Sequence, residues 1–466
     1  MQRVVVCGAG VAGLGAALLL ARAGCAVTVL EGDPDGAPAD PAEAWERWAR
    51  AGVAQFHQPH TLLARFRSVL ATELPDVLDA LLAAGCLEID PLASVPPAIT
   101  DRAPRPDDDR LRLLAGRRPV VEGVLAAAAE REPGVEVRRG VRVAALTTGP
   151  SATPGTPHVT GVRTRDGGEV TADLVVDATG RRTRSTDWLA AIGARVPAPT
   201  SSGRGFVYYT RFFTGPQRPV LRGPTITAMG SISLLALEGD ARTWSLTVFA
   251  LSADRPLKAL RRPEVFDRVI RAFPLAAPLV EGTALTGVLP MAGVLNTRRD
   301  LVADDGRPVV TGFVALSDAW ACTNPSGGRG LSVGLVHAQL LRDLVLGCGE
   351  DPAGFAAAWS ARTDEVVGPF YRTQCAADDA RIAEMAAVAR GEPAQPSAVG
   401  PGAFATAAMH DADLFRALLE ANTCLAHPEE VLARPLVRER LAALGDVEPL
   451  RIPGPDRARL LELVTA

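Results

Sequence analysis

The stretch Val4-Val5-Val6-Cys7-Gly8-Ala9-Gly10-Val11-Ala12-Gly13, close to the start of the chain, decides the fold. Its apolar residues predict a short buried strand, and glycines at the spacing Gly-x-Gly-x-x-Gly follow that strand at once. Leu14–Ala23 is an unbroken apolar, alanine-rich run that predicts a buried helix. Val27–Leu30 predicts a second strand, which ends on Glu31. Together these features form the fingerprint of a dinucleotide-binding βαβ unit.

Each part of this fingerprint has a physical role. Gly8 permits the tight turn, Gly10 lets the backbone approach a pyrophosphate, and Gly13 lets the helix pack closely against the strand. The N-terminus of the helix directs free N–H groups and the positive end of its dipole toward phosphates. Glu31 lies where a carboxylate binds a ribose hydroxyl, which favours FAD or NAD over a 2′-phosphorylated nucleotide.

Length and composition limit the remaining possibilities. The 466 residues suggest about two or three domains with a large buried core. A hydrophobic content of 47% and a net charge of −4 are ordinary for a soluble protein and predict neither a nucleic-acid partner nor attraction to an anionic membrane. The seven cysteines are scattered, without a Cys-x-x-Cys pair or a metal-like cluster, which suits a reducing cytoplasm. The first strand begins at residue 2 and leaves no room for a signal peptide, and no apolar run is long enough to predict a membrane span.

The pattern of the chain changes near Ser201. From there, long antiparallel strands are expected over Gly205–Phe213, Thr225–Leu237 and Thr243–Leu251. Val309–Leu316 returns to the pattern of a buried strand, and a helix is expected from about Gly330 to Leu346. The sequence therefore predicts an α/β protein in three parts: residues 1–200 with 300–350, residues 201–299, and a mainly helical region 351–466.

A second specific stretch runs from Ser317 to Gly330 and reads Ser-Asp-Ala-Trp-Ala-Cys-Thr-Asn-Pro-Ser-Gly-Gly-Arg-Gly. A strand ends next to Asp318, whose carboxylate can accept hydrogen bonds from sugar-alcohol hydroxyls. The glycines Gly328 and Gly330 let the backbone lie against a flat ring. The helix that follows presents its N-terminus, which stabilises the negative charge of a reduced flavin ring.

These two motifs together resemble those of the FAD-dependent monooxygenase superfamily that includes p-hydroxybenzoate hydroxylase. The chain is most similar to its bacterial branch of polyether and squalene-type epoxidases, over roughly residues 4–346. The resemblance implies a Rossmann-like FAD-binding domain of the GR2 type with an inserted antiparallel β-sheet substrate domain and C-terminal helices. It assigns FAD binding to Gly8, Gly10, Val11, Ala12, Gly13, Glu31, Gln55, Arg118, Asp177, Gly180, Asp318, Pro325, Gly328, Gly330 and Leu331, and places His60 and Pro325 beside the reacting atoms.

Two positions depart from the pattern of the hydroxylases in this superfamily. Ser317 stands where the family has the glycine of a Gly-Asp pair, which should be tolerated because the aspartate makes the contact. The middle motif is Asp177-Ala178-Thr179-Gly180 rather than Asp-Gly, a form found in epoxidases, halogenases and geranylgeranyl reductases. Asp177 therefore either touches the flavin side or caps the next helix. Reduction by NAD(P)H is accordingly expected either directly or through a separate flavin reductase.

Aromatic residues suggest a substrate site. Phe206, Tyr208 and Phe212 share one face of an expected strand and either line an apolar pocket or pack on a helix. Trp320 either walls the substrate pocket or fills the core. His60 is either a functional contact or a hydrogen-bonded residue at the start of a helix.

The resemblance implies a monooxygenase in which reduced FAD reacts with O₂, and the flavin hydroperoxide passes one oxygen to an apolar substrate by epoxidation or hydroxylation. It also favours a secondary metabolite, polyketide or terpenoid-like, as that substrate. One alternative is a flavin-dependent reductase or dehydrogenase of the geranylgeranyl-reductase type. A flavin-dependent halogenase fits less well, because the only lysine is Lys258 and no Trp-x-Trp occurs. A protein that keeps FAD without turnover is the non-enzymatic alternative.

Overall fold

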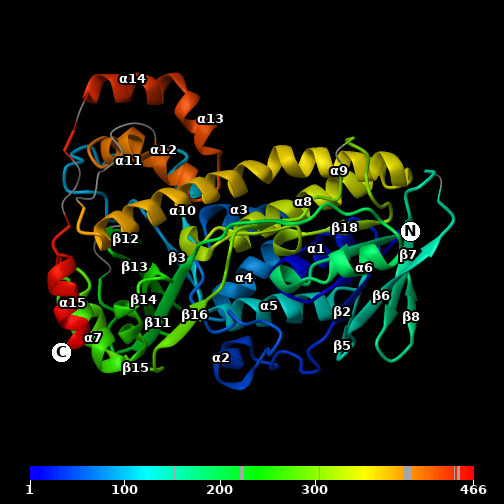
Figure 1. Ribbon diagram of the computed structural model, residues 1–466, viewed down its shortest axis with the longest axis horizontal. Helices are drawn as coiled ribbons and strands as arrows, with labels where there is room; N and C mark the ends of the chain where they lie inside the picture. The colour runs from blue at the N-terminus through cyan, green and yellow to red at the C-terminus, as the bar shows by residue number, and fades with distance from the viewer. Residues whose placement is uncertain (152, 221–224, 304, 393–400, 446, 449–451) are drawn as a thin grey trace.

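A parallel β-sheet forms the centre of the FAD-type fold that the first residues predict. The computed structural model of the chain describes residues 1–151, 153–220, 225–303, 305–392, 401–445, 447–448 and 452–466 (Figure 1). The sheet has the strand order β18-β9-β1-β2-β5, and all its neighbours run parallel. Its strands are β1 (Arg3–Cys7), β2 (Ala26–Glu31), β5 (Val135–Arg139), β9 (Leu174–Asp177) and β18 (Phe313–Ala315). Val4, Val5 and Val6 are buried, as expected for a strand covered on both faces.

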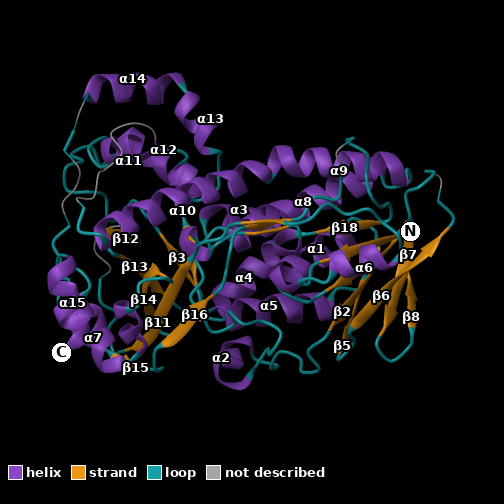
Figure 2. Ribbon diagram, viewed as in Figure 1, coloured by secondary structure: helices purple, strands orange, loops and turns teal. Residues whose placement is uncertain are grey.

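Helices cover one face of this sheet and a smaller antiparallel sheet covers the other (Figures 1 and 2). One hydrophobic core joins the sheet to its helices and includes Leu14, Leu18, Val124 and Leu335. The helices on this side are α1 (Val11–Arg22), α3 (Ala64–Glu73), α4 (Pro75–Ala83), α5 (Arg118–Arg131), α8 (Gly330–Cys348) and α9 (Pro352–Val366). A second core lies under β6 (Val143–Gly149), β7 (His158–Thr164), β8 (Glu169–Thr171) and α6 (Ser185–Ala191).

The second large element is an antiparallel sheet with the order β12-β13-β14-β11-β15, to which β16 adds beside β11. Its strands are β11 (Phe206–Thr214), β12 (Ile226–Met229), β13 (Ile232–Glu238), β14 (Thr243–Leu251), β15 (Thr283–Ala284) and β16 (Leu289–Ala292). One face packs against α7 (Pro263–Arg271) and against α15 (Arg457–Thr465), which brings the last helix of the chain back to this sheet.

The C-terminal region is helical, as the sequence indicates. The long helix α10 (Gly368–Ala389) crosses the antiparallel sheet, where Ile382 and Met385 pack on Phe206, Tyr208 and Phe249. A separate small core joins α11 (Pro401–Ala408), α12 (Ala412–Asn422), α13 (Pro428–Ala433) and α14 (Pro435–Leu444).

Short elements complete the description. The short strands are β3 (Leu87–Ile89), β4 (Leu113–Ala115), β10 (Thr200–Ser201), β17 (Thr297–Arg298) and β19 (Ala321–Cys322). The single-turn helices are α2 (Ala44–Arg47), η1 (Pro41–Glu43), η2 (Asp108–Leu111), η3 (Gly180–Arg182), η4 (Pro256–Arg261), η5 (Ala277–Val280), η6 (Ser317–Ala319) and η7 (Pro325–Gly327).

Two expected strands differ from those observed. The run Thr225–Leu237 is a hairpin of β12 and β13, because Gly230 at φ +60° turns the chain between Met229 and Ile232. Of Val309–Leu316, only β18 joins the parallel sheet, since Thr311 bridges to His158 of the smaller sheet and Gly312 turns at φ +71°. Among the described residues, one helix, Gly330–Cys348, is long and apolar enough to cross a membrane, and 44% of that window is buried inside the protein.

Candidate active site

A cavity of about 610 Å³ lies beyond the carboxyl ends of the parallel strands. It is lined by the turn after β1, the end of β2, the residues after β9 and the motif after β18. Leu235 of β13, Met291 of β16 and Val294, which follows β16, line it on the side of the antiparallel sheet. Ligands of open parallel sheets bind at this edge, so the two motifs singled out in the sequence meet at one cavity, between the two large sheets.

The glycine turn leaves space on its cavity side. Gly8 adopts φ +107°, and a Cβ there would meet the carbonyl oxygen of Ala178 at 2.6 Å. A Cβ on Gly13 would meet the carbonyl oxygen of Gly8 at 2.1 Å. A Cβ on Gly10, in contrast, would meet no protein atom within 4 Å, and Gly10 lines the cavity. The protein itself therefore needs Gly8 and Gly13, whereas the bare backbone at Gly10 leaves room for a ligand.

Glu31 is fixed beside this turn by a buried ion pair. Its carboxylate accepts the N–H of Ala9 at 2.8 Å and that of Asp33 at 2.9 Å, and it contacts the guanidinium of Arg50. Arg50 also donates to the carbonyl of Ala9 at 2.8 Å and to Glu122 at 2.7 Å. The fingerprint turn is therefore tied to α5 through two buried charged groups, Arg50 and Glu122.

The same hydrogen-bonded network continues from Glu122 to Arg118 and His60. Arg118 donates to Glu122 at 2.6 Å, and its Nη1 lies 3.0 Å from Nε2 of His60. Because arginine can only donate, Nε2 accepts and Nδ1–H donates to the carbonyl of Gln58 at 2.9 Å. Burial and the charge of Arg118 lower the pKa of His60 to about 3. His60 is therefore a neutral ring that orients Arg118.

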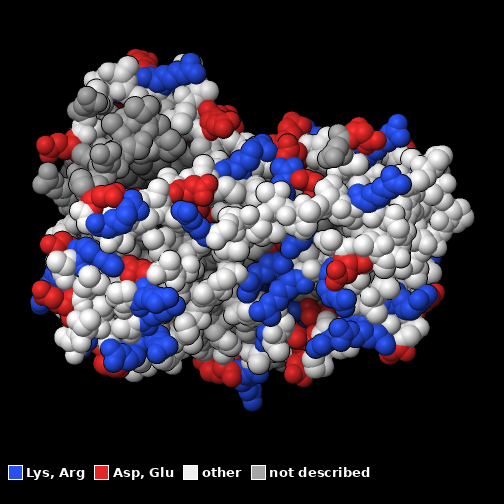
Figure 3. All heavy atoms as spheres, in the orientation of Figure 1, with Lys and Arg blue, Asp and Glu red and all other residues white. Residues whose placement is uncertain are grey.

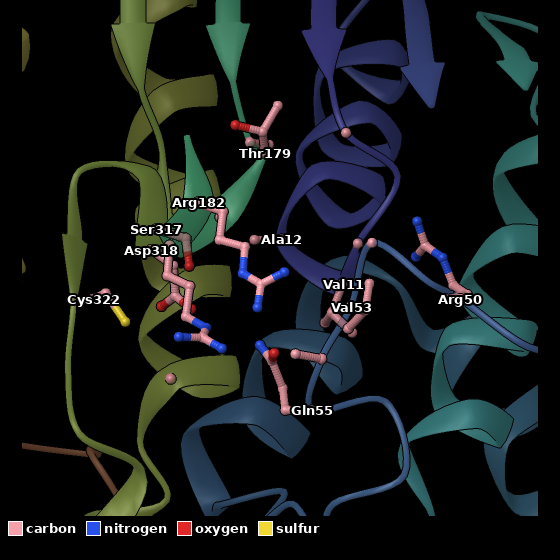
Figure 4. Close-up of a pocket in the computed structure, with 18 of the residues that line it drawn as sticks. Val11, Ala12, Arg50, Val53, Gln55, Thr179, Arg182, Ser317, Asp318 and Cys322 are labelled. Atoms are coloured by element: carbon pink, nitrogen blue, oxygen red, sulfur yellow. The ribbon is translucent and has the colours of Figure 1, made fainter. Parts of the chain in front are cut away.

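Asp318 enters the cavity from the second motif (Figure 4). Burial raises the pKa of its carboxyl, and the charges of Arg118, Arg181 and Arg299 oppose that rise. Ser317 holds a left-handed φ of +54°, and its N–H donates to Nδ1 of His337 at 3.0 Å. The serine thus holds a left-handed conformation that glycine adopts more readily, and the buried His337 fixes the backbone next to Asp318.

Asp177 is bound within its own turn. Its Oδ1 accepts the N–H of Thr179 at 2.9 Å and the hydroxyl of Thr179 at 2.6 Å, while Oδ2 accepts the hydroxyl of Thr183. The side chain is fully buried, and it does not line the cavity, whereas Gly180 does. These contacts bind Asp177 within the turn after β9, and its side chain caps neither η3 nor α6.

Most predicted cofactor residues lie together, and the predicted substrate aromatics lie elsewhere. The cavity is lined by Gly8, Gly10, Val11, Ala12, Glu31, Gln55, His60, Arg118, Gly180, Asp318, Pro325, Gly328, Gly330 and Leu331. Phe206 and Tyr208 pack on Phe249 under α10, and Phe212 packs on Trp45 with ring centroids 4.7 Å apart. Trp320 lines a separate cavity of about 30 Å³ behind Asp318.

Sequence reasoning did not single out several charged residues at the site. Arg142, Arg165 and Arg182 line the cavity, and among the described residues none of them has a carboxylate partner. Figure 4 shows Arg182 reaching into the cavity, with Gln55 pointing toward it from below. Basic side chains also gather near the middle of the face in Figure 3, with acidic side chains at their borders. The run of arginines after Gly180 is the signal that could have marked Arg182.

The arrangement fits FAD. Uncapped N–H groups begin α1 at Gly10, where they can bind a diphosphate. Glu31 is held at the ribose position, and Asp318 makes no hydrogen bond to the described residues, so it can accept the ribityl hydroxyls. The described residues include no group of three or more His, Cys, Asp or Glu side chains that could hold a metal ion. Burial raises the pKa of Cys7 and Cys322 beside the cavity, which keeps both as thiols.

Comparison with known proteins supports the fold. No protein-family model matches the chain. Protein Rv3254 of Mycobacterium tuberculosis is 28% identical over 369 residues, 73% of this chain and 72% of that protein. PqsL, described as a probable FAD-dependent monooxygenase from Pseudomonas aeruginosa, superposes with a TM-score of 0.60 at 17% identity and covers 82% of this chain and 99% of its own. The flavin-dependent brominase Bmp2 superposes with a TM-score of 0.55 at 15% identity, and the superposition covers 100% of this chain and 98% of the brominase. The chain therefore has the fold of these flavin-dependent enzymes, and the expected fold class is confirmed.

Proposed function

We propose that the chain is an FAD-dependent monooxygenase that places one oxygen atom from O₂ into an apolar small molecule. The observation that carries this proposal is the cavity itself, where the bare backbone of Gly10, the fixed carboxylate of Glu31 and the carboxylate of Asp318 line one space that suits the parts of one FAD. When bound and reduced, FAD supplies the activation of O₂, and the protein supplies binding and orientation.

The residues of the chain divide the work of holding FAD. The N-terminus of α1 binds the diphosphate, Glu31 binds the ribose, and Asp318 binds the ribityl chain. Arg118, fixed by Glu122 and His60, provides a positive charge that lines the same cavity as the two motifs. The N-terminus of α8 at Gly330 is uncapped by a side chain and stabilises negative charge on the ring.

The same cavity supports an apolar substrate. Leu235 and Met291 of the antiparallel sheet, Val294 just after that sheet, and Val53 line the cavity with apolar side chains. Such a wall excludes water and binds an apolar polyketide or terpenoid-like secondary metabolite. We propose epoxidation or hydroxylation as the reaction, in a cytoplasmic enzyme that NAD(P)H reduces directly or through a flavin reductase. His60 cannot serve as a proton donor near neutral pH, because its pKa is about 3.

Two other reactions are compatible with the fold or the motifs of the chain. The brominase Bmp2 shares the fold over the whole chain, which favours halogenation. The form Asp177-Ala178-Thr179-Gly180 is shared by geranylgeranyl reductases, epoxidases and halogenases, so it is compatible with a reductase. Because both would use the same cofactor residues, the product must distinguish them.

The test is to supply the FAD-loaded protein with NADPH, a general flavin reductase, bromide, ¹⁸O₂ and squalene as an apolar polyene. The proposal predicts a product that carries one ¹⁸O atom and that disappears in the Asp318→Ala variant, which loses FAD. A brominated product would establish the halogenase, and a saturated product without ¹⁸O would establish the reductase. Either of these products in place of the oxygenated one would refute the proposal.

A further inference from the structure

A buried polar network lies behind the loop of the second motif. At its centre is Asp378 of α10, whose side chain is 2% exposed. Its carboxylate accepts from Nδ2 of Asn296 and from Nε2 of Gln374, both at 2.9 Å, and from the hydroxyl of Ser326. These donors come from three separate parts of the chain: the segment after the antiparallel sheet, α10 itself, and the loop that precedes α8.

The network holds the loop at several adjacent residues. The N–H of Asn324 donates to Oδ1 of Asn296 at 2.6 Å, and the hydroxyl of Tyr208 donates to Oδ1 of Asn324. Nε2 of Gln374 also donates to Ser326 at 2.7 Å. A Cβ on Gly327 would meet Oε1 of Gln374 at 2.2 Å, so the amide packs directly on the loop backbone. On the side away from the cavity, the loop is therefore bound to β11 at Asn324 and to α10 at Ser326 and Gly327.

The opposite side of this loop faces the cavity. Thr323, Pro325 and Gly328 line the cavity from the same short segment whose rear Asp378 holds. These are the positions next to which the flavin ring lies if the proposed function is correct. Any change in the hydrogen bonds at Ser326 or Asn324 therefore moves the wall that meets the ring.

The partners of Asp378 differ from those of the buried acids Glu122 and Asp240 and resemble those of Asp177, which neutral donors also bind. Glu122 and Asp240 are each paired with arginine, so their burial is offset by an opposite charge. Among the described residues, Asp378 forms no ion pair and is satisfied by neutral donors only. An acid buried in this way is costly unless every donor is in place. The Asp378 carboxylate therefore holds the donor groups of Asn296, Gln374 and Ser326 in fixed positions.

We propose that Asp378 is a positioning residue that sets the loop 324–328 against the flavin ring, an inference that rests on the proposed function. The C-terminal helix α10 is by this account part of the active site, although its own side chains do not line the cavity. The loop acts as the link between the helix and the ring.

The test compares Asp378→Asn with Asp379→Asn in the FAD-loaded full chain. Both variants remove one carboxylate from the same helix, but Asp379 is exposed, which makes it a matched control. An amide at position 378 keeps one acceptor oxygen, but its NH₂ group replaces the other oxygen and faces a donor, so at least one of the three hydrogen bonds is lost. We expect amide hydrogen exchange in residues 322–330 and the rate of FAD dissociation each to rise about tenfold in Asp378→Asn. Neither should change in Asp379→Asn.

A second variant covers the case in which Asp378→Asn does not fold. Ser326→Ala removes one donor from the loop and leaves the buried carboxylate with its other two partners. It should raise exchange in residues 322–330 several-fold without changing exchange in β11. Unchanged exchange of this loop in both variants, or an equal rise in Asp379→Asn, would overturn the role of Asp378. A wild-type chain that binds no FAD would overturn the proposed function instead, and exchange of the loop would still test whether Asp378 positions it.

Discussion

Replacement of Glu122 by glutamine tests the buried chain of charges beneath the cavity. Glu122 is fully buried and accepts from Arg50 at 2.7 Å and from Arg118 at 2.6 Å. Removing one partner from a buried ion pair costs about 3–5 kcal/mol, because the remaining charge stays buried. Glutamine keeps one acceptor oxygen, so we expect a loss near the lower end, about 3 kcal/mol in the free energy of unfolding.

The assay is urea unfolding of the full chain at pH 7, with Glu136→Gln as the control. Glu136 pairs with Arg138 at the surface, with exposed side chains on both sides, so its loss should cost less than about 1 kcal/mol. The Glu122→Gln variant should also release FAD more readily, because Arg118 and Glu31 lose their fixed positions. Equal stability of the two variants would refute the reasoning.

The pH dependence of the stability lost in Glu122→Gln gives a further check. Burial opposes the charge of Glu122, but Arg118 and Arg50 hold its pKa below the ordinary value of 4.5. A carboxylate whose pKa is lower in the folded than in the unfolded chain stabilises the fold at every pH above its unfolded pKa. This stabilisation is lost as the pH falls through its folded pKa. The difference in the free energy of unfolding between wild type and Glu122→Gln should therefore be constant above about pH 5 and should narrow below about pH 4.5.

Other predictions address single positions. Gly10→Val should abolish FAD binding with little change in thermal stability, because its side chain meets only the cavity, whereas Gly13→Ala should destabilise the fold itself. Ser317→Gly should raise the free energy of unfolding by about 1 kcal/mol in urea, since glycine accepts φ +54° without strain. Burial lowers the pKa of His337 to about 3, so the neutral folded state loses stability as the pH falls below about 6.5. His337→Gln should show a slope between pH 7 and 5 that is shallower by up to about 1.4 kcal/mol per pH unit.

The local patterns of the sequence were sufficient for the parallel sheet and for both motifs. The apolar run at Val4–Cys7 and the glycine spacing depend only on neighbouring residues, and the structure has β1 where it is expected, whereas α1 begins at Val11, before the expected Leu14. The first part of Val309–Leu316 could not be read in this way. Its first residues pair with His158 in another sheet, and no local signal reports that competition.

Local sequence patterns also fail to report the long-range contacts of the site. Arg50 and Glu122 are 72 positions apart in the sequence and meet only because α5 packs under the fingerprint turn. The alternation of Phe206 and Tyr208 predicts one face of a strand but not what covers it, and the structure places α10 there. Sequence alone therefore indicated the residues whose role is local and missed those whose role depends on packing.

The most direct test of the central claim is the visible absorption spectrum of the purified chain after incubation with FAD and removal of free cofactor. The account predicts a bound flavin spectrum in the wild type and none in Gly10→Val, with both proteins folded. If reductant is then added without oxygen, bleaching of that spectrum shows direct reduction by NAD(P)H, and bleaching only with an added reductase shows the need for a partner. A folded wild-type chain that retains no FAD would contradict the account from its first motif onward.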